Sequence, residues 1–372
     1  MSDAHGSQPV PQPLRPQVGA GLEDQSLRER FDGHELAIVL SHYDLGVIEQ
    51  LRVYPRGSRR SPKLRIKSKR GEFLLKRRAP GQDDPYRVAF AHDLQLHLAQ
   101  RDYPVPGLIG TRDENNSMLQ LNGRTYELFN YIHGTRYDKS ANAATQVGGM
   151  LGKLHQCLSA YRSVYTPPPS SFHRVAEIDA KMALTASAIN SAEPQGDPQA
   201  IAQTAEFLRR AYHDASKRAD EVGFAGWALQ VLHGDWHPGN LLFRGNAIVG
   251  VLDFDSARME PRVVDVANAA LQFSMPMDDP DQPATWPEGL DTGVIRCILR
   301  GYDEASGSPL SNQERLALPW LMIEALIIES IIPIAVTGSF ARIAGSAFLQ
   351  MIERKVKWIR PRALKMAESL KE

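Results

Sequence analysis

The sequence predicts a two-lobed α+β fold, with a small lobe of mostly antiparallel strands and a larger lobe built mainly from helices. The chain has 372 residues, which is long enough for two hydrophobic cores. Residues 51–129 contain short apolar runs of alternating polarity, whereas apolar residues at helical spacing dominate the remainder. We therefore expect a small lobe at 27–129 and a large lobe at 130–372, after a disordered, proline-rich tail at 1–26.

The composition gives no sign of a polyanionic partner. Lys and Arg total 43, as do Asp and Glu, so no net field attracts nucleic acid or a membrane surface. Cys157 and Cys297 are far apart and form no disulfide or metal-binding pattern. Residues 1–20 contain no apolar stretch typical of a signal peptide. We expect a cytoplasmic protein without a nucleic-acid or membrane partner.

The expected small lobe starts with a helix and continues through strands around one further helix. Residues 30–45 have the apolar spacing of a helix, and residues 85–100 form the second one. Strands are expected wherever short β-prone runs lie between turn signals. These runs are residues 51–54, 63–67, 72–76, 109–111, 118–121 and 125–129.

A strongly basic stretch covers the first strands. Residues 56–78 contain eleven Lys or Arg and a single acid, Glu72. Leu64 and Ile66 alternate with basic neighbours at period two, which is typical of a strand with one solvated face. A nucleic-acid-binding patch is the competing interpretation, although Phe73 is the only aromatic residue among these charges.

The strand at 72–76 has a face suited to a nucleotide. Leu74 and Lys76 are two positions apart, so their side chains point to the same side of a strand. An apolar roof for a base and a cation for phosphate can therefore share one surface. The competing interpretation is that Lys76 is one more solvated cation.

Helices account for most of the expected large lobe. His155 lies on the first of them and is expected to be a core or capping histidine. The last is apolar enough to be weighed as a membrane span, but Glu324 and Glu329 within it would each cost roughly 2.5–3.5 kcal/mol on insertion. We therefore expect a helix buried in the lobe. The helical segments are residues 144–158, 178–189, 200–222, 263–273 and 316–336.

A polar loop between two apolar runs carries the clearest functional signal. Residues 231–243 have Gly and Pro in their centre and β-prone residues at both ends, which predicts a strand, a tight loop and a second strand. A further strand at 248–252 ends at Asp253. A hairpin would bring Asp235, Asn240 and Asp253 to one rim.

This rim has the chemistry to hold Mg²⁺ on a polyphosphate and to orient a hydroxyl group, because carboxylate and amide oxygens are hard ligands. Taken singly, an Asp in such a loop is more often a turn former or a helix cap. A zinc site formed by His233 and His237 is another interpretation, but Pro238 and Gly239 disfavour the helix that would bring the two rings together.

The rim and the segment after it resemble the aminoglycoside phosphotransferase and choline kinase-like family, which includes type II homoserine kinases. The resemblance is sharp over residues 229–270 and extends from residue 51 to the C-terminus. It implies a two-lobed protein-kinase-like fold. The motifs that carry it are His233-x-Asp235-x4-Asn240, Asp253-Phe254-Asp255 and Pro261-x3-Asp265.

The resemblance implies catalytic and metal-binding roles on the rim. Asp235 is then the base or orienter of the acceptor hydroxyl, and His233 is the catalytic-loop residue that braces it. Asn240 and Asp253 are the Mg²⁺ ligands that the resemblance implies, with Asp255 as a second metal-side carboxylate.

The resemblance further implies a buried structural acid at Asp265 and a nucleotide site on the small lobe. Leu74 is the implied cover for adenine and Lys76 the implied phosphate ligand. A hinge around Glu127 and Phe129 is implied to pair its main-chain groups with the base.

Two departures from the kinase pattern concern the phosphate side. The helix that follows Lys76 has no glutamate to pair with it, which leaves Asp93 or the upstream Asp83 and Asp84 as substitutes. The turn that contains Gly57 has a single glycine rather than a glycine-rich loop.

We expect ATP- and Mg²⁺-dependent phosphoryl transfer to a hydroxyl of a small molecule. Amino-alcohols, amino-sugars, homoserine and sugars stay open as acceptors, because a fold alone does not give a substrate. The competing hypotheses are a catalytically inactive nucleotide-binding scaffold and a nucleic-acid binder that uses the basic stretch.

Two acids in the apolar helix at 316–336 bear on the acceptor. Glu324 and Glu329 would be costly to bury as unpaired charges. Each either lines the acceptor cleft and binds an amine of the substrate, or pairs with a basic residue of a neighbouring helix. The basic residues considered are Arg296, Arg300 and Arg342.

Overall fold

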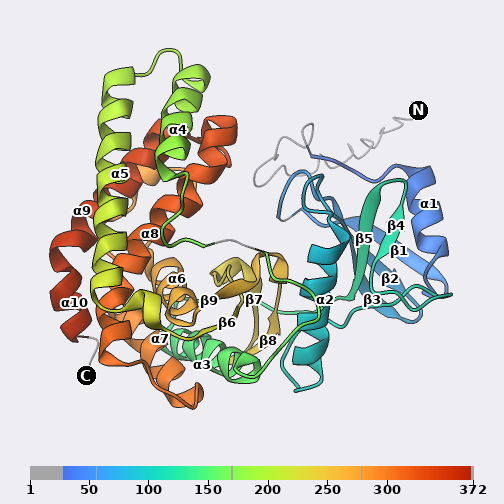
Figure 1. Cartoon of the computed structure of the whole chain (residues 1–372). Coiled ribbons are helices and arrows are strands. Elements are labelled where there is room, and N and C mark those ends of the chain that lie inside the picture. Colours follow the sequence, from blue (N-terminus) through green and yellow to red (C-terminus); the bar gives the residue numbers. More distant parts are fainter. Residues whose placement is uncertain (1–27, 56, 169–170, 278, 370–372) are drawn as a thin grey trace, which may run out of the picture.

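The computed structural model confirms the two-lobed α+β architecture (Figure 1). It describes residues 28–55, 57–168, 171–277 and 279–369. The predicted tail at 1–26 lies outside these residues. Within the described residues, the small lobe has a five-stranded sheet flanked by α1 and α2, and the large lobe contains the other helices and three two-stranded sheets.

The small-lobe sheet has the strand order β1-β2-β3-β5-β4, and every neighbouring pair is antiparallel. Side chains alternate between its two faces. Leu64, Ile66 and Leu75 are buried on one face, and Leu74 and Lys76 lie on the other, as the period-two pattern predicts. The strands are β1 (Ile48–Val53), β2 (Lys63–Ser68), β3 (Gly71–Arg77), β4 (Leu119–Leu121) and β5 (Arg124–Asn130).

Helix α1 (Gly33–Ser41) covers the apolar face of this sheet. Asp32 caps its first turn, and Glu35 completes a capping box. Glu35 also accepts hydrogen bonds from Arg77 at 2.6 and 2.8 Å and from Tyr126 at 2.7 Å. One glutamate therefore both caps the helix and ties it to two strands.

Carboxylates neutralise part of the basic stretch. Lys67 pairs with Glu49 at 3.4 Å, and Arg65 forms an ion pair with Glu72. Arg77 is buried under α1 by its contacts with Glu35 and Glu29. The positive charges of β2 and β3 are thus largely part of the internal charge balance of the sheet.

The predicted strand at 109–111 is wrong. The described chain makes a single isolated bridge there, between Leu108 and Phe129. The N–H of Ile109 donates to the carbonyl of Leu128 at 2.8 Å, but that of Thr111 donates to Asn116 at 2.9 Å in a turn. The segment therefore touches β5 without continuing as a strand. Helix α2 (Pro85–Ala99) forms as predicted, with Asp84 as its N-cap.

The predicted helices of the large lobe are confirmed, with ends shifted by a few residues. Gly148 permits the closest approach between two of them, because a Cβ atom there would lie 1.8 Å from the carbonyl oxygen of Ile298. Helices α3 and α7 therefore meet backbone to backbone at this point. The helices are α3 (Ala141–Leu158), α4 (Ile178–Ala192), α5 (Pro198–Glu221), α6 (Val263–Ser274), α7 (Thr292–Ala305), α9 (Gly345–Ile359) and α10 (Ala363–Ser369).

The apolar helix α8 (Asn312–Thr337) is the central helix of the large lobe. It packs against α4, α5, α6 and α10. By length and composition it is the one described helix that could cross a membrane, but 67% of its apolar window is buried inside the protein. The prediction of a buried helix is therefore confirmed, and α8 brings Glu324 and Glu329 into the lobe.

Candidate active site

The predicted polar rim forms between two short antiparallel ladders of the large lobe. β6 pairs with β9, which the sequence did not predict, and β7 pairs with β8. The N–H of Leu252 donates to the carbonyl of Asn240 at 2.9 Å, so the loop after β6 and the segment after β8 lie side by side. The strands are β6 (Leu229–Leu232), β7 (Leu241–Arg244), β8 (Ala247–Val251) and β9 (Arg258–Pro261).

His233 joins this loop to the end of β8. Its Nε2–H donates to the carbonyl of Leu252 at 3.0 Å, and its Nδ1 accepts the N–H of Asp235 at 3.2 Å. The ring is fully buried, and burial lowers the pKa of His233. A neutral imidazole with a proton on Nε2 satisfies both partners, so His233 has the geometry of a brace.

Asp265, near the start of α6, holds the main chain of the same loop. Its carboxylate accepts the N–H groups of His233 at 2.8 Å and of Gly234 at 2.9 Å. His155 lies 3.3 Å from it and also contacts the Tyr302 hydroxyl at 2.8 Å. Burial would raise the pKa of Asp265, but His155 and His233 outweigh it and lower the pKa. The predictions of a structural acid and a core histidine are confirmed.

Asp235 is the accessible carboxylate of the loop, with 38% of its side chain exposed. Asn240 Nδ2 donates to its Oδ2 at 3.0 Å, and His237 Nε2 lies 3.4 Å from the same oxygen. Burial would raise the pKa of Asp235, but His237 outweighs it and lowers the pKa. Asp235 is therefore an ionised acceptor that can receive a hydrogen bond from a hydroxyl group.

The sequence suggested His237 only as a possible zinc ligand, whereas both of its ring nitrogens contact residues of its own loop. Its Nδ1 accepts the N–H of Gly239 at 3.0 Å, and its Nε2 faces Asp235. Its position two residues after Asp235, in a loop that turns back on itself, is the sequence signal that would have indicated this contact.

Lys76 projects from β3 toward the acids of the large lobe. Its Nζ lies 2.7 Å from Asp255, 3.6 Å from Glu127 and 3.7 Å from Asp253. Burial would lower the pKa of Lys76, but the three carboxylates outweigh it and raise the pKa. Lys76 is therefore a charged group held between the lobes, and the interpretation of a plain solvated cation is wrong.

The acid that partners Lys76 comes from a strand, which corrects the sequence prediction. Glu127 on β5 is opposite Lys76 in the sheet register. The three predicted substitutes are engaged elsewhere: Asp84 caps α2, Asp83 accepts the N–H of Gly81, and Asp93 accepts hydrogen bonds from the hydroxyls of Tyr161 and Ser163.

Glu127 is fully buried, and its carboxylate belongs to the charge network around Lys76. Arg78 donates to its carboxylate at 2.8 and 2.9 Å, and His92 of α2 contacts it at 2.7 Å. Lys76 and Arg78 lower the pKa of Glu127 despite its burial. Arg78 lies two positions after Lys76, so period-two counting would have placed it on the same face.

The predicted main-chain hinge also needs correction. Both edges of β5 are occupied as far as Asn130, by β3 on one side and by residues 107–109 on the other. The half-buried side chain of Phe129 lies opposite Leu74, on the face of the sheet that carries Lys76.

Asp253 and Asp255 differ in what they contact. Asp255 is held by Lys76 at 2.7 Å and by Arg78 at 2.6 Å, so it balances two cations rather than presenting a free metal ligand. Asp253 has a left-handed backbone with φ of 65° and a side chain that is 38% exposed. Lys76 lowers the pKa of Asp253, but burial and Asp255 outweigh it and raise the pKa.

The donor set fits a Mg²⁺ ion shared with a substrate. Asn240 uses its amide nitrogen for Asp235, which leaves its amide oxygen to join Asp253 as a ligand. The described residues contain no cluster of three His, Cys, Asp or Glu side chains arranged for a metal. Mg²⁺ commonly takes one or two protein oxygens and completes its shell with phosphate and water, so this sparse set is suitable.

The acids on α8 have separate surroundings. The carboxylate of Glu324 contacts His173 at 3.1 Å and accepts a hydrogen bond from Ser216. Glu329 accepts a hydrogen bond from Gln272. Burial, and then the charge of Asp235, raises the pKa of Glu329 to about 7, while His237 acts in the opposite direction. Glu329 is thus a neighbour of the reactive loop.

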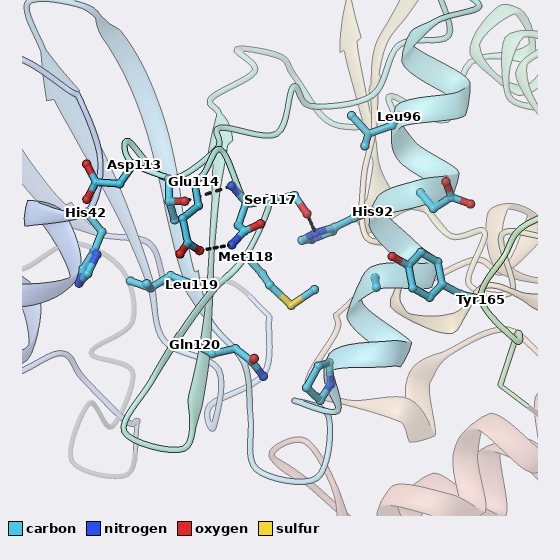
Figure 2. Close-up of a pocket in the computed structure, with 15 residues that line it drawn as sticks. His42, His92, Leu96, Asp113, Glu114, Ser117, Met118, Leu119, Gln120 and Tyr165 are labelled. Carbon is cyan, nitrogen blue, oxygen red and sulfur yellow. Dashed lines mark hydrogen bonds between the residues drawn. The ribbon is translucent and has the colours of Figure 1, made fainter.

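A cavity of about 700 Å³ lies apart from this rim, between α2 and the loop before β4 (Figure 2). His92 forms part of its wall and contacts Ser117 at 2.8 Å through Nδ1. The His92 Nε2 contacts Glu127 at 2.7 Å, so His92 links the wall of the cavity to one of the carboxylates around Lys76. Its other lining residues include Asp93, Glu114, Met118 and Tyr165.

A charged lysine on a small-lobe strand faces an Asp–Asn loop and a further Asp of the large lobe. This arrangement defines a kinase-like phosphotransferase, in which a lysine and metal-binding residues hold a polyphosphate while an aspartate receives the acceptor hydroxyl. The chain belongs to the phosphotransferase enzyme family, whose sequence model matches residues 51–305.

Relatives of the chain are small-molecule kinases. A homoserine kinase from Rhodopseudomonas palustris (strain BisA53) is 26% identical over 292 residues, covering 77% of this chain and 79% of that protein. A solved microcompartment-associated aminopropanol kinase has a TM-score of 0.65 at 16% identity, covering 91% and 100% of the two chains. An amicoumacin kinase solved with AMP-PNP and Ca²⁺ has a TM-score of 0.64 at 12% identity, covering 89% and 94%. The two structures show the shared fold.

Proposed function

We propose that the chain transfers a phosphoryl group from ATP, with Mg²⁺, to the hydroxyl of a small molecule that carries an amino group. Homoserine is the first compound to test, because the relative from Rhodopseudomonas palustris is named a homoserine kinase. The neighbouring amicoumacin kinase was solved with an ATP analogue and a divalent cation, which supports the nucleotide and the metal.

The observation that carries the proposal is the neighbourhood of Asp235. Its side chain binds Asn240, whose amide oxygen with Asp253 suits Mg²⁺. The charge of Glu329 also interacts with Asp235. A hydroxyl bound at Asp235 would then have the metal-side pair Asn240 and Asp253 next to it, and Glu329 would offer a carboxylate to an ammonium group of the acceptor.

Each side chain then has one task in the transfer. Lys76 keeps its charge beside the acids and attracts the phosphate oxygens of ATP. Mg²⁺, when bound, neutralises charge on the transferring group. Asp235 orients the acceptor hydroxyl and takes its proton as the bond from the hydroxyl oxygen to the γ-phosphorus forms and the bond from that phosphorus to the bridging oxygen breaks, releasing ADP. His233 and Asp265 hold the loop so that Asp235 does not move.

Two measurements test the proposal. MgATP should raise the melting temperature of the purified full chain, and EDTA should cancel the shift. Phosphate transfer should then be screened over homoserine, 1-amino-2-propanol, an aminoglycoside and a neutral sugar, with Asp235→Asn as the inactive control. Absence of any MgATP stabilisation would contradict nucleotide binding. Transfer to a neutral sugar in preference to every amine would contradict the acceptor class.

A further inference from the structure

The sheet that carries Lys76 has a second lysine directly beside it. Lys63, the first residue of β2, is paired with Lys76 in the β2–β3 register. Directly opposed residues of an antiparallel pair lie on the same face. Two ammonium groups therefore share the surface that faces the acids of the large lobe, although like charges in this relation destabilise a sheet.

The two lysines differ in their partners. Lys76 has three carboxylates within 4 Å, whereas no ion pair or hydrogen bond involves the Lys63 side chain within the part of the chain that the structure describes. Burial lowers the pKa of Lys63, and Lys76 adds to this effect, while Asp253 and Asp255 oppose it. Lys63 thus faces the same acids from beyond ion-pair distance.

The ammonium group of Lys63 lies against the turn between β1 and β2. A Cβ atom on Gly57 would come within 2.5 Å of Lys63 Nζ, and Gly57 has a φ of +82°. The positive φ favours glycine at this position, and a Cβ atom there would push the Lys63 ammonium group aside. Gly57 is thus the position in the turn that the Lys63 ammonium group approaches.

We propose that Lys63 is a second phosphate-binding residue, which contacts the nucleotide polyphosphate together with Lys76 and compensates for the missing glycine-rich loop. The proposal rests on the proposed function. Three carboxylates already balance the charge of Lys76, so Lys76 alone provides little net positive charge to attract a triphosphate. Lys63 offers an ammonium group with no carboxylate to displace, on the same face as Lys76.

The test measures nucleotide affinity by isothermal titration of the full chain with MgATP, MgADP and adenosine. Lys63→Met should weaken MgATP and MgADP binding roughly ten- to a hundredfold, the range for losing a charge-assisted hydrogen bond. Adenosine binding should stay within about twofold, because adenosine has no phosphate. Lys63→Arg should retain most of the MgATP affinity.

The matched control is Lys67→Met, which removes an ammonium group from the same strand and face but from an exposed pair with Glu49. It should leave all three affinities unchanged, and all variants should melt within a few degrees of the parent. Equal MgATP affinity in Lys63→Met and Lys67→Met would overturn the role of Lys63 while leaving the proposed function intact. Equal loss of adenosine and MgATP binding would also overturn it, because the effect would then be structural. Failure of the parent chain to bind MgATP would instead overturn the proposed function.

Discussion

Glu324 and Glu329 lie on the same buried helix, yet their surroundings differ in kind. Glu324 is fully buried and receives hydrogen bonds from His173 and Ser216. His173 itself contacts Asp220, and these acids raise the pKa of His173 although burial opposes them. Glu329 has the neutral amide of Gln272 as its hydrogen-bond partner and the like charge of Asp235 nearby.

The difference separates an acid of the scaffold from an acid of the site. A buried carboxylate with matched donors is held in place and adds to the packing of its helix. A half-buried carboxylate that meets a neutral amide and another carboxylate is in unfavourable surroundings in the free protein, and a cationic ligand would relieve this. The sequence predicted Arg296, Arg300 or Arg342 as partners of these acids, whereas Glu324 is paired with a histidine instead.

The largest effect on turnover should come from Asp235, the carboxylate whose charge interacts with Glu329. Asp235→Asn should lower turnover by roughly a hundredfold or more, since the positioned proton acceptor is lost. Its MgATP affinity should stay within about twofold, because Asp235 is on the acceptor side. Steady-state kinetics and nucleotide titration check this, with Asp253→Ala as the control that should lose metal-dependent nucleotide binding. If both variants lose ATP binding equally, Asp235 does not belong to the acceptor side.

Glu329→Gln should raise the KM for an amino-bearing acceptor roughly ten- to a hundredfold, because the charged partner of the ammonium group becomes neutral. Turnover at saturation and the KM for ATP should change little. The measurement is a pair of Michaelis curves, one for each substrate. An unchanged acceptor KM would show that the amine is bound elsewhere and would remove the contrast with Glu324.

The acceptor KM should also depend on pH. Burial raises the pKa of Glu329 to about 7, so its carboxylate gains charge as the pH rises through 7. An acceptor amine stays protonated over this range, and its KM should therefore fall by up to about tenfold between pH 6 and pH 8. Glu329→Gln should flatten this dependence. The same slope in both proteins would assign the titration to another group.

Glu324→Gln should have the smallest effect on catalysis and a clear effect on folding. The amide turns one acceptor oxygen into a donor that faces the donors of His173 and Ser216. The free energy of unfolding should fall by about 1–3 kcal/mol, as measured by urea denaturation at pH 7, while the acceptor KM stays within about twofold. A large change in KM with unaltered stability would reverse the roles of the two acids.

Local patterns predicted the parts of the site that lie close together in the sequence. Alternation along β3 put Leu74 and Lys76 on one face, and the polar loop flanked by strands put Asp235 next to Asn240. These two relations follow from the period of a strand and from a single tight turn, so the sequence contains them. Asp265, whose carboxylate holds the loop from α6 across more than thirty residues, was indicated by the family resemblance instead.

Contacts between distant strands were not predictable in this way. Glu127 meets Lys76 because β5 pairs with β3 although β4 precedes it in the sequence. A search for the partner along the next helix led to Asp83, Asp84 and Asp93, all of which have other contacts. The pairing of Lys63 with Lys76 was missed for a related reason, since register between strands depends on the turn and on the buried face.

The position of Glu127 also bears on how such an enzyme is controlled. Protein kinases take the acid that pairs with the strand lysine from a mobile helix, so swinging that helix switches the enzyme off. Here the acid is fixed by the β3–β5 register, and α2 adds only the supporting contact of His92. Displacing α2 would leave the lysine and its carboxylate side by side. The ion pair between Lys76 and Glu127 therefore does not depend on the position of a helix.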